Sequence, residues 1–125
     1  MNKFITFRKK IFYEYKKNLN NIKNLTLVDF EKNISPSFHL ILLNFSKKNS
    51  LKFKEKLLIN LKKNKIYAQY HYIPIYMFKI FKQKIYLKKT KEFYYNTISL
   101  PVYFNLKIKD VKKICNCLKI AFEKQ

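Results

Sequence analysis

The pattern of apolar and polar positions predicts three amphipathic helices. In residues 2–20, 50–64 and 108–122, apolar side chains recur every three or four positions, and this spacing places them on one helix face. Ser50 stands where it can cap the second helix, and Asn64 stands where the residue after a helix takes a left-handed conformation. Each helix is expected to pack one face on a core; in the first helix that face consists of Phe4, Phe7, Ile11, Phe12, Tyr15 and Leu19.

Three shorter apolar runs predict strands. They span residues 38–45, 66–72 and 97–102, and the second is rich in strand-forming residues and stops before Pro74. Residues 77–95 are expected to be irregular or briefly helical. The order helix, strand, helix, strand, short helices, strand, helix indicates an α/β or α+β layer of three strands covered by helices.

Composition fits one folded unit with a very basic surface. The chain has 125 residues, 48% of them hydrophobic, which is enough for a single core. Its net charge is +21, yet Arg8 is the only arginine among 28 basic residues, whereas recognition of phosphates and bases favours the arginine fork. We interpret the lysines as a solvated surface that AT-rich codons produce. A small basic module for nucleic acid or an anionic membrane is the alternative.

Targeting and membrane signals are weak in this sequence. No apolar run approaches the roughly 18 residues that cross a bilayer, so we expect no membrane span. The first ten residues have charges on both sides of a very short apolar stretch, unlike a signal peptide. A cytoplasmic location is the resulting prediction.

Free-standing catalytic chemistry has little support. His39 and His71 are the only histidines, the chain has seven acidic residues, and it has no glycine for a phosphate-binding loop. Cys115 and Cys117 are separated by one residue, so a helix places them about 200° apart, where they cannot share a metal or form an unstrained disulfide. We expect no metal site, no catalytic residue in this chain and structural roles for both cysteines.

The segment YHYIPIY, residues 70–76, concentrates aromatic and backbone-restricting residues. Pro74 ends the predicted strand, and this leaves aromatic faces, the His71 imidazole and unpaired backbone carbonyls at one place. Such a combination suits a nucleotide or a sugar. The alternative is that His71 is a satisfied, partly buried histidine and the tyrosines pack at a sheet edge.

An ordered series of motifs resembles the C-terminal part of the DegT/StrS nucleotide-sugar aminotransferases, and within that group the aminotransferases of the pseudaminic-acid pathway. The resemblance runs from about Phe4 to Phe122. It covers the leading helix FRKKIFYEYKKNL, a Ser-x-x-His-Leu strand, a His-Tyr-x-Pro element, a Tyr-Tyr pair and a Ser-Leu-Pro element. These motifs fall on Ser35 or Ser37 with His39 and Leu40, on His71, Tyr72, Ile73 and Pro74, on Tyr94 and Tyr95, and on Ser99, Leu100 and Pro101.

The resemblance implies a pyridoxal-phosphate enzyme that transfers an amino group, typically from glutamate, to the C4 keto group of a UDP-linked 4-keto-6-deoxy sugar. It implies three mostly antiparallel strands packed against helices, as in the C-terminal domain of fold-type I aminotransferases. Residues 1–34 would then be the leading helix from a large domain, and residues 35–125 the small domain. The large domain, missing here or on a separate polypeptide, would supply the cofactor-binding lysine, and the full enzyme would be a homodimer.

The resemblance also implies the site residues. His71, Tyr72, Ile73 and Pro74 would bind the UDP-sugar, whereas the residues that contact the cofactor stay unknown. Tyr76 and Met77, with Phe78, would form the pocket wall, and His39 would be structural. This chain alone is expected to be inactive, either as a truncated remnant or as half of a split enzyme, and to expose apolar faces where the large domain is missing.

The lack of glycine has a consequence for the backbone. Every left-handed residue must be Asn, Asp or Lys, at a cost of up to about 1–2 kcal/mol for each position. Relatives often have glycine where this chain has Tyr67 and Asn105, so these positions are candidates for an unusual backbone conformation.

Overall fold

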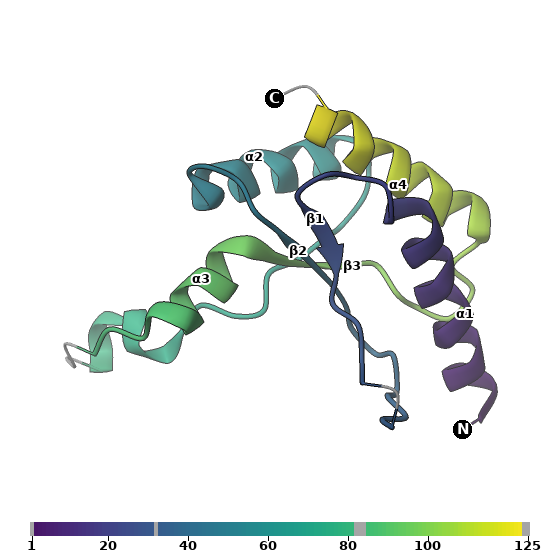
Figure 1. The fold of residues 1–125 in the computed structure, drawn as a ribbon, viewed down its shortest axis with the longest axis horizontal. Helices are drawn as coiled ribbons and strands as arrows, with labels where there is room; N and C mark the ends of the chain where they lie inside the picture. Colours follow the sequence, from purple (N-terminus) through teal and green to yellow (C-terminus); the bar gives the residue numbers. More distant parts are fainter. Residues whose placement is uncertain (1, 32, 82–84, 124–125) are drawn as a thin grey trace.

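The computed structural model describes residues 2–31, 33–81 and 85–123 (Figure 1). The described residues form four helices and three short strands in the order α1, β1, β2, α2, α3, β3 and α4, and two 3-10 turns, η1 and η2, precede α3. The elements are α1 Asn2–Leu19, β1 Leu25–Leu27, β2 Ile41–Phe45, α2 Ser50–Lys63, η1 Ile75–Met77, η2 Lys79–Phe81, α3 Lys88–Asn96, β3 Thr97–Leu100 and α4 Ile108–Glu123. The three long helices lie where the apolar periodicity predicts them.

The strands form one antiparallel sheet in the order β1-β2-β3. In the central strand, Ile41 pairs with Leu100 of β3 and Phe45 pairs with Leu25 of β1. The side chains of Ile41, Leu43 and Phe45 are buried, and those that alternate with them are half-buried. The expected fold class, three antiparallel strands packed against helices, is confirmed.

A single core joins the sheet to α1, α2 and α4. Helices α1 and α4 pack side by side, and both contribute to the same buried cluster as β2 and β3 (Figure 1). At one end of the core, Phe45 of β2 meets Phe53 of α2 and Phe122 of α4, with ring centroids 5.2 and 6.0 Å away. Because α1 buries four residues in this core, it is an integral part of the fold; these are Ile11, Phe12, Tyr15 and Leu19.

The prediction of a strand over residues 66–72 is wrong. This segment makes one isolated bridge to β3, in which Gln69 and Ser99 exchange hydrogen bonds of 3.1 and 2.6 Å. It leaves α2 through a turn closed by the Ile66 N–H, which donates to the Leu61 carbonyl at 2.9 Å, and it comes into register with β3 at one position. The third strand is β1, which is three residues long and therefore too short to show an alternating pattern.

Local backbone features also differ from the sequence-based expectations. Strand β2 begins at Ile41 instead of residue 38, because Phe38 has a φ of 50° and leaves the extended region. Ser50 does not cap α2: the cap position is the left-handed Asn49, and the Ser50 hydroxyl donates to the Lys47 carbonyl at 2.6 Å. After α2, Asn64 has a φ of −87° and the left-handed residue is Lys65.

Five described residues have positive φ, and Asn and Lys account for all except Phe38. Asn105 has a φ of 72°, as the expected glycine-like position requires. Tyr67 is not among the described residues with positive φ; Lys65, two positions earlier, takes that role with a φ of 60°. The remaining two are Asn24 and Asn49.

Replacing Lys65 with glycine is expected to stabilise the chain. Glycine removes the steric cost of a left-handed lysine, and we expect Lys65→Gly to raise the free energy of unfolding by about 0.5–1 kcal/mol in urea denaturation. Lys63→Gly, a matched change inside the last turn of α2, should lower it by about 0.5–1 kcal/mol because that residue is helical. Equal effects of the two variants would contradict this account.

Residues 70–81 and 85–96, called the arm below, extend to one side of the molecule, away from α1 and α4 (Figure 1). None of the described residues in η1, η2 and α3 is buried. Large apolar side chains are exposed here, with Tyr72 at 74% and Ile80 at 81% exposure. The other large apolar side chains exposed on the arm are Tyr70, Ile75, Phe78, Phe81, Ile85, Tyr86, Leu87 and Phe93.

Among residues 2–31, 33–81 and 85–123, no helix combines the length and the apolar character that a bilayer crossing requires.

Candidate functional site

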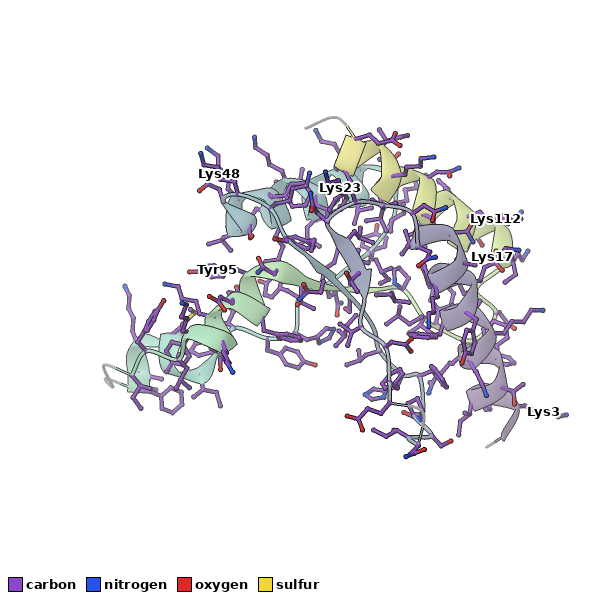
Figure 2. All side chains as sticks on the ribbon, viewed as in Figure 1. Lys3, Lys17, Lys23, Lys48, Tyr95 and Lys112 are labelled. Atoms are coloured by element: carbon purple, nitrogen blue, oxygen red, sulfur yellow. The ribbon has the colours of Figure 1, made fainter. Side chains whose placement is uncertain are left out.

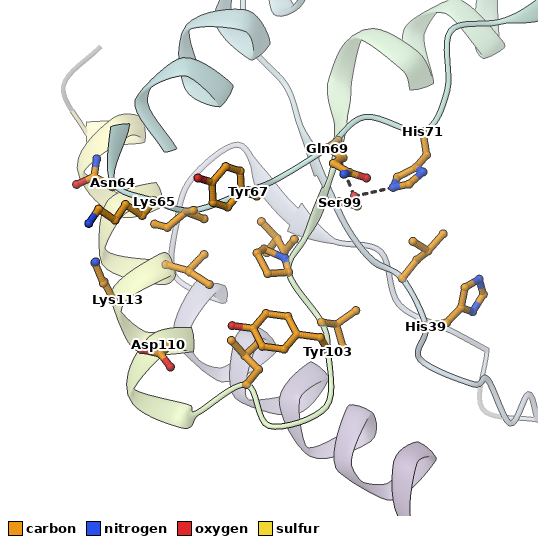
Figure 3. Close-up of a pocket in the computed structure, with 17 residues that line it drawn as sticks. His39, Asn64, Lys65, Tyr67, Gln69, His71, Ser99, Tyr103, Asp110 and Lys113 are labelled. Atoms are coloured by element: carbon orange, nitrogen blue, oxygen red, sulfur yellow. Dashed lines mark hydrogen bonds between the residues drawn. The ribbon is translucent and has the colours of Figure 1, made fainter. Parts of the chain in front are cut away.

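A groove of about 540 Å³ lies between β3, the segment that follows α2 and the first turns of α4 (Figure 3). Its volume is within the range of small-molecule sites. The floor is apolar and includes Leu100, Leu106 and Ile114. Its polar lining consists of His39, Asn64, Lys65, Tyr67, Gln69, His71, Ser99, Tyr103, Asp110 and Lys113.

The hydrogen bonds of Ser99 fix the His71 side chain at the groove. Ser99 is buried in β3, and its hydroxyl donates to the Gln69 carbonyl at 3.3 Å. His71 Nε2 lies 2.8 Å from the same hydroxyl oxygen (Figure 3). Which atom of the His71–Ser99 pair donates depends on the tautomer of His71, and in either tautomer the pair leaves Nδ1 as the ring nitrogen that Ser99 does not contact.

The Nδ1 atom of His71 has no hydrogen-bond partner among the described residues, although it is buried. The ring of Tyr72 lies edge-on beside the imidazole, with centroids 4.5 Å apart. A buried polar atom without a hydrogen-bond partner costs about 1–3 kcal/mol. A polar group of a ligand or partner that reached Nδ1 would recover this cost.

The other predicted binding residues lie beyond the groove, at the start of the arm. Tyr72 is exposed, Ile73 is half-buried and Pro74 is buried. Tyr76 and Met77, both half-buried in η1, also lie outside the described groove lining. The structure therefore brings His71 into the groove and leaves the remaining five on the arm beside it.

The expectation of unpaired carbonyls after Pro74 is wrong. The Pro74 carbonyl accepts the Met77 N–H at 2.9 Å, and the Ile75 carbonyl accepts the Phe78 N–H at 3.0 Å. The chain turns into the 3-10 turn η1 directly after the proline, and this turn pairs the carbonyls locally. The carbonyls of Pro74 and Ile75 are therefore used within η1 and are not what this segment offers a ligand.

Several groove residues were not identified from the sequence. Tyr67 and Tyr103 lie on opposite sides of the groove, and Lys65 and Lys113 lie toward one end (Figure 3). They come from the segment after α2, the segment after β3 and α4, and no spacing in the sequence connects them. His39 stands at the other end, is exposed and shares a 2.8 Å hydrogen bond with the Ser37 hydroxyl, and its structural role stays a prediction.

The cysteines lie on different sides of α4, as the helical spacing predicts. Cys115 is buried and Cys117 half-buried, and both are free thiols. Burial raises the pKa of the Cys115 thiol to about 12, so this thiol is protonated and inert at neutral pH. Within the described residues, no three His, Cys, Asp or Glu side chains gather as a metal ion would require.

Comparison with known proteins identifies the family. Residues 1–119 match the profile of the DegT/DnrJ/EryC1/StrS aminotransferase family. A UDP-4-amino-4,6-dideoxy-N-acetyl-beta-L-altrosamine transaminase from Helicobacter pylori is 38% identical over 61 residues, which cover 46% of this chain and 16% of that protein.

Solved structures show the same fold. Helicobacter pylori PseC, an aminotransferase involved in the biosynthesis of pseudoaminic acid, superimposes with a TM-score of 0.88 at 27% identity over 97% of this chain and 33% of PseC. The aminotransferase TlmJ from Streptoalloteichus hindustanus superimposes with a TM-score of 0.89 at 14% identity over 98% of this chain and 33% of TlmJ. This chain thus spans about a third of the length of these solved aminotransferases, and it belongs to the DegT/DnrJ/EryC1/StrS aminotransferase family.

Proposed function

We propose that this chain is the C-terminal third of a sugar aminotransferase that moves an amino group, from glutamate, to the C4 keto group of a UDP-linked 4-keto-6-deoxy sugar. The observation that carries the proposal is the His71–Ser99 pair at a groove of ligand size. It lies within a fold shared at 27% identity with PseC. The name of the altrosamine transaminase supports a UDP-linked deoxysugar as substrate. The role of PseC in the biosynthesis of pseudoaminic acid supports a surface-glycan pathway of that type.

Members of this family use pyridoxal phosphate, and the lysines of this chain do not fit the lysine that binds it. Lys54 is buried, its amine is bonded to a backbone carbonyl, and two aromatic rings cover it. The other described lysines are exposed or half-buried on the surface. The cofactor, which acts as an electron sink for the carbon that gains the amino group, is therefore assigned to the two-thirds of the enzyme outside this chain.

Within the proposed enzyme, this chain contributes to binding and orienting the sugar nucleotide. Ser99 holds the His71 ring at the groove, and Nδ1, which is buried and has no partner among the described residues, is the ring atom that would pair with a polar group of the sugar. Tyr72 exposes most of its ring and offers a stacking surface, and Ile73 and Pro74 set its position. Tyr76 and Met77 would close the wall once the large domain is present.

We further propose that residues 1–34 lead from the large domain into residues 35–125. Whether the rest of the enzyme precedes this chain in the same polypeptide or comes from a separate one is decided by the DNA upstream of its first codon. A reading frame there with the cofactor-binding lysine supports the proposal, whereas an unrelated gene on both sides would favour a remnant. The cytoplasmic location and the homodimer stay predictions.

His71→Ala is expected to weaken binding of UDP-N-acetylglucosamine, a stable stand-in for the keto sugar, at least tenfold. The substitution removes the only predicted ligand contact that also lines the groove. Binding is followed by isothermal titration at fixed ionic strength, and His39→Ala serves as the matched control because it lies at the far end (Figure 3). Equal affinities of the His71→Ala variant and the unchanged chain would contradict the assignment of His71.

The same titration separates this proposal from a basic binding module. The labelled lysines lie on α1, in the loop after α1, in the loop before α2, and on α4 (Figure 2). Exposed lysines also occur on α2 and α3, and their spread over all four helices favours a solvated surface. Binding through lysine charge alone would weaken steeply with salt, and its affinity would be equal for pyrophosphate and the UDP-sugar. We instead expect a higher affinity for the UDP-sugar than for pyrophosphate, and a loss of that affinity in His71→Ala.

A further inference from the structure

The arm is attached to the rest of the domain by few buried contacts. Its 3-10 turns and α3 contain no buried residue among those described, and it touches the body mainly where α3 meets α2. Yet the arm begins at Tyr70, directly before His71. Apart from the hydrogen bond between His71 and Ser99, the placement of His71 and Tyr72 therefore depends on what holds the first and last residues of the arm.

Lys54 of α2 lies at that junction. It is 1% exposed and is the only buried charged residue in the part of the chain that the structure describes. Its amine donates a hydrogen bond to the Tyr94 carbonyl, and it lies 3.7 Å from the centroid of the Tyr94 ring and 5.2 Å from that of Tyr70. One side chain thus contacts α3 and the residue next to His71.

We propose that Lys54 is a positioning residue that holds the arm, and with it His71 and Tyr72, on the body of the domain. The inference rests on the proposed function for what His71 is positioned to bind, but the contacts themselves are independent of any substrate. Lys54 is not in the groove and is not proposed to touch a ligand.

The chemistry of the junction suits an amine at this point. Tyr94 lies in the last turn of α3, where carbonyl groups have no partner within the helix and the helix dipole is negative. The Lys54 amine supplies the missing donor. The faces of the Tyr70 and Tyr94 rings, which meet edge-to-face at 5.7 Å, are regions of negative potential that attract a cation.

Burial of the amine couples the arm to pH. Desolvation lowers the pKa of Lys54 to about 8, against which the Glu55 carboxylate acts in part. The phenols that contact the amine are those of Tyr70 and Tyr94. Burial raises the pKa of Tyr94, so this phenol stays neutral. No anion contacts the protonated Lys54 amine, so burial of its charge is unfavourable. The neutral amine keeps the hydrogen bond to the Tyr94 carbonyl without the cost of burying a charge.

The sign of the pH effect follows from this shift. With the arm in place the pKa of Lys54 is about 8, and with the arm released the amine is in water and has its ordinary value of 10.5. The released state therefore binds more protons between these values, so attachment of the arm strengthens as pH rises from about 8 to about 10.5. Below pH 8 the cost of burying the ammonium is fully present.

Hydrogen exchange measured by NMR on the whole chain tests the inference. Lys54→Ala is expected to lower the protection factors of the α3 amides at least tenfold and to leave those of β2 unchanged. Lys56→Ala, which removes an exposed lysine from the same helix, should change neither. In the unchanged chain, α3 protection should rise about thirtyfold from pH 7 to 9.5, since the pKa of Lys54 is about 8 with the arm in place and 10.5 with the arm released. In Lys54→Met, which keeps the length without the charge, it should not depend on pH.

Two results would overturn the inference. One is α3 protection that is the same in Lys54→Ala and the unchanged chain; the other is a Lys54 side-chain carbon resonance that titrates near 10.5. If Lys54→Ala also lowers the protection factors of β2, two measurements separate release of the arm from general destabilisation. They are the pH dependence of α3 protection in Lys54→Met and the titration of Lys54 in the unchanged chain. These measurements contain no sugar nucleotide, so they are independent of the proposed function. Release of the arm in Lys54→Ala would support this inference even if His71→Ala bound the UDP-sugar as well as the unchanged chain does, a result that would refute the proposed function.

Discussion

Phe45→Ala is expected to lower the free energy of unfolding by about 3–5 kcal/mol, the range for loss of a buried phenylalanine. Phe45 is 1% exposed, ends the central strand and contacts the rings of Phe53 and Phe122. Those two rings are themselves in contact, with centroids 5.0 Å apart. Removing Phe45 leaves a cavity where sheet, α2 and α4 meet, and the rigid elements around it cannot close the gap.

This loss is large for a chain of 125 residues, since a domain of such size has a total stability of about 5–15 kcal/mol. Urea denaturation followed by circular dichroism measures it. Ile59→Ala is the matched control, because Ile59 is exposed on α2 and its truncation should cost less than about 0.5 kcal/mol. Similar effects of the two substitutions would show that the three rings are not part of one core.

The helices could be predicted because their signal is local and repeated. In α1 and α4 the apolar residues return every three or four positions over four turns or more, and burial follows that period. The cysteines of α4 illustrate it: two residues apart, one is buried and the other half-buried, as the spacing requires.

The strands show where local pattern is insufficient. Residues 66–72 have strand-forming side chains, but a strand also needs a neighbour in register, and the chain offers β3 at one position only. Strand β1 has three ordinary residues, and it is a strand because β2 lies beside it. Such pairing is tertiary information, which a single sequence does not contain.

The site was predicted in part for the same reason. His71 was singled out by its neighbours in the sequence, and the fold places it at the groove. Its partner Ser99 and the opposite wall at Tyr103 come from a segment about thirty residues later and were not connected with it. Lys54 was one of 27 lysines in the sequence, and only burial beneath two tyrosines distinguishes it.

A chimera is expected to show the largest functional effect. The chain alone, supplied with pyridoxal phosphate, glutamate and the UDP-linked keto sugar, should form no detectable 2-oxoglutarate, because none of its described lysines fits the cofactor. Joined to the first two-thirds of Helicobacter pylori PseC in place of the matching third, it should restore transfer. The physical reason is that this third keeps the PseC fold, with a TM-score of 0.88 over 97% of the chain.

The measurement that tests the central claim most directly is therefore the rate of 2-oxoglutarate formation by this chimera, with cofactor uptake followed by its absorbance. We predict transfer to the UDP-linked keto sugar, and a kcat/KM at least tenfold lower when the chimera carries His71→Ala. A chimera that folds and takes up pyridoxal phosphate but transfers no amino group would contradict the claim that this chain completes a sugar-nucleotide pocket.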